Sequence, residues 1–361
     1  MGVGDLQKLG LMAGEWVDVR SKDEILATLD KNGRLDELPF MPQMFQYCGQ
    51  RLRVIKRAHR LCDTQFATEG RAMNDAVVIE GLRCDGQNYG GCEMGCVLIW
   101  KEAWLKRSSE SAAMTATPAA LGTGCTEAEL QAATVLPPLP DAIALGPRYV
   151  CQATQLTPAT QPLSFWSIPH FVEDFKSGNE PIGKLVSGIF VAVYYNLAES
   201  GLGFGSVMRW AYDKVQGFRG KTLYVHRKGH LPLNGKTPTL ELNLRPGELV
   251  RTKSHNEILD TVNYNLVNRG MGFHPELVPY CGRVFRVKFR VTKIINEKTG
   301  HLIELKNPCI VLEGVNCRGR FGRPLFCPKN SYPYWREIWL ERVEETPQTL
   351  AEFELDCQQI T

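Results

Sequence analysis

The sequence predicts an α+β fold in which two related, small β-barrel-like repeats flank a helical insert. Two observations predict it: segments near both ends of the 361-residue chain repeat one another as short strand patterns, and the residues between them have helical periodicity. The composition agrees, because 43% hydrophobic and 22% charged residues are ordinary for a globular protein. A formal net charge of +3 is too small to indicate nucleic-acid binding by itself.

An internal duplication organises the chain. The offset that places YCG at residues 47–49 on YCG at 280–282 also places EIL at 24–26 on EIL at 257–259. After a short insertion, the closing sequence WKEAWL (100–105) matches WREIWL (335–340). Chance does not keep one register over such a span. The N-terminal repeat therefore spans about 14–107 and the C-terminal repeat about 247–342.

The elements of each repeat follow in the same order. The openings GEWVDVRS (14–21) and GELVRTKS (247–254) alternate apolar and polar residues as a half-buried strand does, and one or two helical turns follow. Further strands are predicted for RLRVIKRA (51–58), AVVIEGL (76–82) and their counterparts RVFRVKFRVTKII (283–295) and CIVLEGV (309–315). The two closing tryptophans stand at helical spacing or on a twisted final strand. Short strands with Gly-rich turns favour a small, partly open β-barrel.

The insert differs in kind from the repeats. Residues 108–147 are rich in Ser, Ala, Thr and Pro and predict a linker or a loosely ordered loop. Residues 148–246 are predicted to be mainly helical and to end in strands over 221–246. The helix IGKLVSGIFVAVYYNLA (182–198) is apolar nearly all round, which predicts burial, and it is too short to span a bilayer.

A cysteine constellation marks the N-terminal repeat. Cys62, Cys84, Cys92 and Cys96 provide four thiols, enough for a tetrahedral Zn²⁺ shell or the corners of an iron–sulfur cluster. Glycines surround them in CDGQNYGGCEMGC (84–96), and glycine lets a backbone curl until several sulfurs converge. His59 could replace Cys62 as the fourth ligand. We therefore predict a metal site, with zinc or an iron–sulfur cluster as the cofactor.

The duplication provides an internal comparison for this site. Cys84 and Cys92 have cysteine counterparts at 317 and 327, whereas Cys62 and Cys96 correspond to Ile295 and Ser331. The pattern predicts that the first copy keeps a metal site and the second does not. The alternatives are buried free thiols, which are common in protein cores, and a disulfide, which requires an oxidising compartment.

Other candidates have simpler interpretations. His170 with Glu173 and Asp174 could perform general acid–base catalysis, although acidic residues are also favoured near a helix N-terminus. His226 and His230 have a metal-pair spacing but lie in a strand and turn pattern. The basic stretches 51–60 and 283–293 alternate cations with apolar residues, which is typical of a solvated strand face, so nucleic-acid binding is not expected.

The N-terminus has no basic segment followed by an apolar core, so no secretory signal is expected and the predicted location is the cytoplasm. There, the twelve cysteines are expected to be thiols or metal ligands, and no membrane association is predicted.

Two resemblances complete the prediction. The opening of each repeat resembles the start of an SH3-like barrel over about 50 residues. The WKEAWL and WREIWL closings and the YCG turns resemble uncharacterised bacterial proteins of specialised-metabolite gene clusters, over most of the chain. The resemblance brings no catalytic residue with it.

Two functions are therefore considered. The first is a metal-binding tailoring enzyme of a biosynthetic pathway, with a small-molecule or carrier-bound substrate. The second is a non-catalytic module whose paired SH3-like barrels hold a peptide, a carrier protein or nucleic acid.

Overall fold

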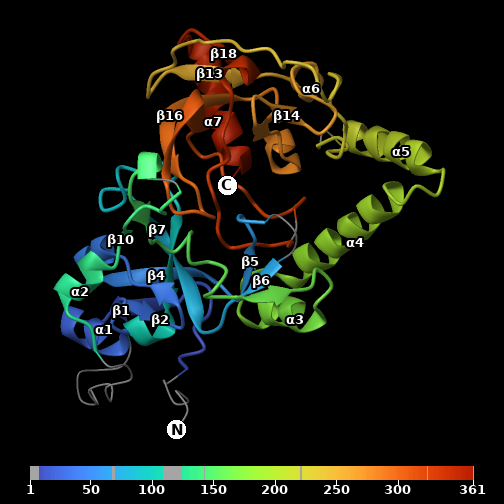
Figure 1. The fold of residues 1–361 in the computed structure, drawn as a ribbon. Helices are drawn as coiled ribbons and strands as arrows, with labels where there is room; N and C mark the ends of the chain where they lie inside the picture. Colours follow the sequence, from blue (N-terminus) through green and yellow to red (C-terminus); the bar gives the residue numbers. More distant parts are fainter. Residues whose placement is uncertain are drawn as a thin grey trace. The chain divides into compact units, whose positions relative to one another are not determined.

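The computed structural model describes residues 8–66, 70–108, 124–141, 143–219, 222–322 and 324–360, and their helices and strands show a mixed α+β fold (Figure 1). The chain divides into two compact units. Unit 1 contains the described residues up to Leu185 together with two pieces of the C-terminal repeat, 293–304 and 324–331. Unit 2 contains the remaining residues, 186–292, 305–322 and 332–360.

Unit 1 is built on a curled, half-barrel sheet with the strand order β8-β7-β4-β1-β9. Its strands are β1 (Trp16–Val19), β4 (Arg51–Arg57), β7 (Ala76–Arg83), β8 (Val97–Lys101) and β9 (Leu105–Arg107). Smaller sheets pair β2 (Arg34–Leu35) with β3 (Leu38–Pro39), β10 (Val135–Leu136) with β11 (Arg148–Tyr149), and β6 (Gly70–Ala72) with both β5 (Arg60–Cys62) and β12 (Gln161–Leu163). The helices are α1 (Lys22–Thr28), η1 (Pro42–Tyr47), η2 (Glu102–Trp104), α2 (Glu127–Ala132), η4 (Ile143–Leu145) and α3 (Ile168–Lys176).

Unit 2 is built on a second half-barrel sheet with the order β17-β16-β13-β18. Its strands are β13 (Leu249–Thr252), β16 (Val284–Ile295), β17 (Leu302–Leu312) and β18 (Leu340–Arg342), and β14 (Val267–Asn268) pairs with β15 (Met271–Gly272). Its helices are α5 (Gly205–Phe218), α6 (His255–Leu259), η5 (Pro275–Tyr280), η6 (Glu337–Trp339) and α7 (Pro347–Ile360). Helix α4 (Ile182–Ala198) begins in unit 1, and the ends of β16 and β17 that face their connecting turn also belong to unit 1.

The strand registers confirm the duplication. In unit 1, Val17 of β1 lies opposite Leu52 of β4 and Arg107 of β9. In unit 2, the equivalent Val250 lies opposite Phe285 and Arg342, which are the counterparts of those partners. Both α1 and α6 begin with a Ser-x-x-Glu capping box, in which side chain and backbone satisfy each other's hydrogen bonds. The predicted order of elements within each repeat is therefore correct.

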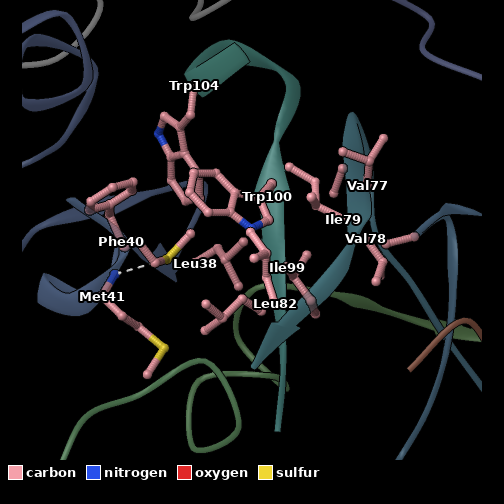
Figure 2. Packing of buried hydrophobic residues seen from close by; sticks show 14 of the residues in the cluster. Leu38, Phe40, Met41, Val77, Val78, Ile79, Leu82, Ile99, Trp100 and Trp104 are labelled. Atoms are coloured by element: carbon pink, nitrogen blue, oxygen red, sulfur yellow. Dashed lines mark hydrogen bonds between the residues drawn. The ribbon is translucent and has the colours of Figure 1, made fainter. Parts of the chain in front are cut away.

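Each closing sequence forms a single 3₁₀ turn followed by a short strand, and it places two tryptophans in a core. Phe40 meets Trp100 and Trp104 edge-on, with ring centroids 6.1 and 5.1 Å apart (Figure 2). The Trp104 indole N–H donates to Thr28 Oγ1 at 3.2 Å, so its polar atom is satisfied in the interior.

Unit 2 repeats this arrangement with equivalent residues. Phe273 packs edge-on against Trp335 and Trp339 at 6.5 and 5.3 Å, and the Trp339 indole donates to Thr261 Oγ1 at 2.9 Å.

A buried glutamate lies between the two tryptophans of each closing sequence. The Glu102 side chain accepts hydrogen bonds from the backbone N–H groups of Gly10 and Leu11 and lies 3.3 Å from an Arg57 nitrogen. It is only 1% exposed. The carboxylate thus fixes the segment that precedes the repeat to the end of the sheet.

The equivalent Glu337 does the same in unit 2. It accepts the N–H groups of Leu242 and Leu244 at 2.8 and 3.0 Å and pairs with Arg290 at 2.6 Å. Burial acts to raise the pKa of Glu337, but these N–H groups and the Arg290 guanidinium outweigh it, so its pKa lies below the ordinary value.

The predicted strands over 221–246 are wrong, because in its described part this segment is extended without joining a sheet. Several of its backbone donors bond to side chains instead: Tyr224 N–H donates to the Asp213 carboxylate, and Leu242 and Leu244 donate to Glu337. Others, such as those of His230 and Leu231, donate to backbone carbonyls of 259–262. Alternating apolar residues indicate an extended chain, but they do not show which acceptor the chain will find.

The predicted burial of the 182–198 helix is also wrong. Helix α4 covers the predicted residues, Ile182–Ala198. Tyr195 and Ala198 of α4 enter the core of unit 2, but Val186 and Phe190 are 63% and 69% exposed. Only one face of this apolar helix is covered. In the described part of the chain, no helix is both long and apolar enough to cross a membrane.

The predicted linker, 108–147, is only partly described. Residues 109–123 lie outside the described residues. Beyond them, α2 begins with a Thr126–Glu129 capping box, and its Leu130 is buried in the core of unit 1. This part of the segment is a packed element rather than a loose loop.

We predict that Glu337→Gln lowers the free energy of unfolding of unit 2 by about 1–3 kcal/mol at pH 7, because buried N–H groups lose a charged acceptor. A carboxylate with a lowered pKa stabilises the fold above its ordinary pKa, and this contribution is lost as the pH falls through its folded value. The difference between wild type and variant should therefore shrink on acidification, as measured by urea unfolding at neutral and acidic pH. Glu345→Gln is the control, since the exposed Glu345–Arg286 pair should contribute less than about 1 kcal/mol.

Candidate functional site

Six cysteines of unit 1, called here the thiol cluster, form a set of four interacting thiols and a separate pair, and Lys329 interacts with both. It draws on β5, on the loop between β7 and β8, on the segment after β11, and on the 324–331 piece of the C-terminal repeat. Its members are Cys62, Cys84, Cys92, Cys96, Cys151 and Cys327. The Cys84 thiol interacts with Cys151 and Cys92, and the Cys96 thiol with Cys151 and Cys84.

The loop from Cys84 to Cys96 curls as its glycines predict. Four of them, at positions 86, 90, 91 and 95, have φ values between 60° and 74°, a region that favours glycine. A Cβ atom at Gly86 would stand 1.9 Å from the Cys92 carbonyl oxygen, so no other residue fits there. The Cys84 N–H donates to the Cys96 carbonyl at 2.8 Å and closes the loop.

Cys62 and Cys327 form the polar end of the cluster. The Cys62 backbone N–H donates to Cys327 Sγ at 3.2 Å. Lys329 Nζ lies 3.4 Å from the Cys62 carbonyl oxygen and 3.2 Å from Thr64 Oγ1. Thr64 in turn donates to the Glu297 carboxylate. A thiol pair, an ammonium group and a carboxylate therefore meet in one place.

These neighbours set the charge states. The hydrogen bond with Cys327 and the positive charge of Lys329 lower the pKa of Cys62 to about 6, against the opposing effects of burial and Glu297. Burial favours a neutral Lys329, but Cys62 and Glu297 outweigh it and raise the pKa of the amine. At neutral pH, Cys62 is a thiolate facing an ammonium group.

Four other thiols of the cluster have raised pKa values and are protonated at neutral pH. Burial raises the pKa of Cys84 to about 12 and that of Cys151 to about 11, and it shifts the pKa values of Cys92 and Cys96 in the same direction. The cluster thus combines one thiolate with a reserve of buried, neutral thiols.

Of the predicted ligands, Cys84, Cys92 and Cys96 interact with one another, whereas Cys62 bonds to Cys327 and His59 takes a different set of partners. His59 Nε2 lies 3.2 Å from Asp174 Oδ1 and 3.2 Å from the His170 carbonyl oxygen. As the side chains stand, no three His, Cys, Asp or Glu residues within the described ranges are close enough to share one ion.

The three residues of the predicted acid–base group, His170, Glu173 and Asp174, have separate partners in the structure. Asp174 is fully buried and sits beside His59 and Arg60, while Glu173 pairs with Arg57 at 3.4 Å. His170 Nδ1 instead contacts the Ser167 hydroxyl at 2.9 Å. The carboxylates therefore attach α3 to β4 and β5.

The sequence prediction missed Cys151, Cys327, Lys329 and Glu297. The repeat alignment pairs Cys327 with Cys92, but it does not show that Cys327 approaches Cys62. That approach follows from pieces 293–304 and 324–331 lying in unit 1, and no local spacing encodes it.

Comparison of this chain with protein-family models, with curated proteins and with solved structures found no match.

We predict that iodoacetamide alkylates Cys62 in chelator-treated protein with a rate that is half-maximal near pH 6, because the thiolate is the nucleophile. Cys281, whose pKa burial raises to about 12, should react slowly throughout the neutral range. Peptide mass spectrometry after timed quenching measures both rates.

Lys329→Met should move the Cys62 midpoint upward by about 1–3 pH units, since an adjacent cation is removed. Equal rates for Cys62 and Cys281, or an unchanged midpoint in the variant, would contradict this account of the charges.

Proposed function

We propose that this protein is a metal-binding protein in which the thiol cluster of unit 1 holds a soft metal ion, zinc in the first place and an iron–sulfur cluster as the alternative. The observation that carries the proposal is that four interacting thiols, from Cys84, Cys92, Cys96 and Cys151, share the neighbouring Lys329 with the Cys62–Cys327 pair. Thiolates are the ligands that zinc and iron–sulfur clusters prefer. Gathering so many thiols serves metal coordination better than core packing, which aliphatic side chains would fill without a reactive group.

The expected ligands are Cys62, Cys84, Cys92 and Cys96, with Cys327 available beside Cys62. Cys62 already carries the charge of a ligand, and metal coordination deprotonates the remaining thiols despite their raised pKa values. Metal binding therefore has to shift side chains and release protons. The positive charge of Lys329 offsets part of the charge of several thiolates.

The wider role rests on the resemblance to bacterial biosynthetic proteins. We infer a tailoring enzyme with a small-molecule or carrier-bound substrate, in which two SH3-like repeats flank a helical insert. The two half-barrel sheets with matching register support the architecture. If the cluster is a closed four-thiolate zinc site, the metal has only the structural role of holding a loop in place. That result would support the alternative of a non-catalytic binding module.

We expect about one zinc per chain, without colour, in protein purified without oxygen, or iron with acid-labile sulfide and a brown colour. Elemental analysis and a visible spectrum distinguish the two. Cys84→Ala should lose most of the metal, whereas Cys281→Ala, which removes a half-buried thiol of unit 2, should keep it. The absence of metal from wild-type protein, or equal metal in both variants, would show that the proposal is wrong.

A further inference from the structure

Unit 2 contains a cavity of about 630 Å³, a size typical of sites for small organic ligands. All of its lining residues lie between 199 and 264 and belong to unit 2. They come from the end of α4, from α5, from the extended segment 222–230, and from α6 and the loop that follows it. The cavity is therefore separate from the thiol cluster.

Two aromatic rings line the cavity and remain open to solvent. Trp210 of α5 is 61% exposed and Tyr264 is 51% exposed. Exposed large aromatics in a cavity provide flat faces on which a planar ring can stack. Gly229 keeps the segment 222–230 close to the loop of Tyr264, since a Cβ there would stand 2.1 Å from the Asn263 carbonyl oxygen.

The polar part of the lining carries excess positive charge. Arg209, Arg227 and Lys228 contribute cations, against the carboxylates of Glu199 and Asp213. Lys228 Nζ lies over the Tyr264 ring, 5.2 Å from its centre, so a cation covers one face of this ring and the other face is left for stacking. His226 and His230 also line the cavity and add further positive charge when protonated.

The two carboxylates orient the guanidinium groups. Glu199 pairs with Arg209 at 3.2 Å and Asp213 pairs with Arg227 at 2.6 Å. Glu199 also accepts the Tyr224 hydroxyl, and Asp213 accepts the Tyr224 backbone N–H. Both acids are thus engaged, while a guanidinium has five donors and can bind a second anion through those that remain.

We propose that this cavity binds an organic anion with a planar ring, of the class of nucleoside phosphates. The base stacks on Trp210 or Tyr264, and the phosphate binds Lys228 and the guanidinium donors of Arg209 and Arg227. A ligand should bind well only if it carries both a planar ring and an anionic group, because the stacking faces and the cations line the same cavity.

The test is isothermal titration calorimetry of the full chain with the 5′-monophosphates of adenosine, guanosine, cytidine and uridine. We expect saturable one-to-one binding of at least one of them below about 1 mM. The matching nucleoside and ribose 5-phosphate, which carry the ring and the anion separately, should each bind at least about tenfold more weakly.

Trp210→Ala and Lys228→Ala should each weaken binding about five- to tenfold. Their matched controls are Trp166→Ala, an exposed tryptophan of unit 1, and Lys214→Ala, an exposed lysine of α5 outside the lining, and both should bind as wild type. Circular dichroism melting confirms that every variant is folded.

Three results would overturn the proposal: no saturable binding of any monophosphate, equal binding of ribose 5-phosphate and the nucleotide, or binding that survives both cavity substitutions. None of these results bears on the metal content of unit 1.

Discussion

A buried, ion-paired glutamate is the constraint on which each repeat depends. Glu102 and Glu337 occupy equivalent positions, pair with the equivalent Arg57 and Arg290, and accept backbone N–H groups from the segment that leads into the repeat. An uncompensated carboxylate in a core costs several kcal/mol, so these partners have to be in place together. They fix the 3₁₀ turn of the closing sequence, and this turn carries Trp104 or Trp339 into the aromatic core beside Phe40 or Phe273.

The thiol cluster depends on a reciprocal exchange between the repeats. Cys62 donates its N–H to Cys327 Sγ, and Ile295, the counterpart of Cys62, donates its N–H to Cys92 Sγ. Thr64 contacts Glu297, its own counterpart. Equivalent residues thus make equivalent contacts. The two contacts differ in the donor residue, which is Cys62 in one and Ile295 in the other. The hydrogen bond with Cys327 and the charge of Lys329 then lower the pKa of Cys62, whereas burial raises that of Cys92.

Much of the fold can be predicted from the sequence because the pattern of each element occurs twice in the chain, once in each repeat. The strand alternations of each repeat and the glycines of the 84–96 loop are local signals, and both are found in the structure. The errors come from non-local partners. Residues 222–246 find side-chain acceptors and the backbone carbonyls of Leu259 and Val262 instead of a strand, and α4 is covered on one face only. For the candidate site, Cys84, Cys92 and Cys96 interact as a set, whereas Cys62 bonds to Cys327 and His59 to Asp174. The approach of Cys327 and Lys329 depends on distant pieces of the chain, which no local spacing indicates.

The contribution of C-terminal residues to unit 1 also affects how the chain folds during synthesis. Unit 1 begins at the N-terminus, yet it contains residues 293–304 and 324–331. Domains generally fold as units during synthesis, the N-terminal one first. Here the first unit has to wait for nearly the whole chain, and its closing contacts join residues more than two hundred positions apart, such as Cys62 and Cys327. Loop closure over such separations is slow, so Cys84, Cys92 and Cys96 are synthesised long before their surroundings are complete. An emerging chain with exposed thiols is open to oxidation and to premature metal capture throughout that interval.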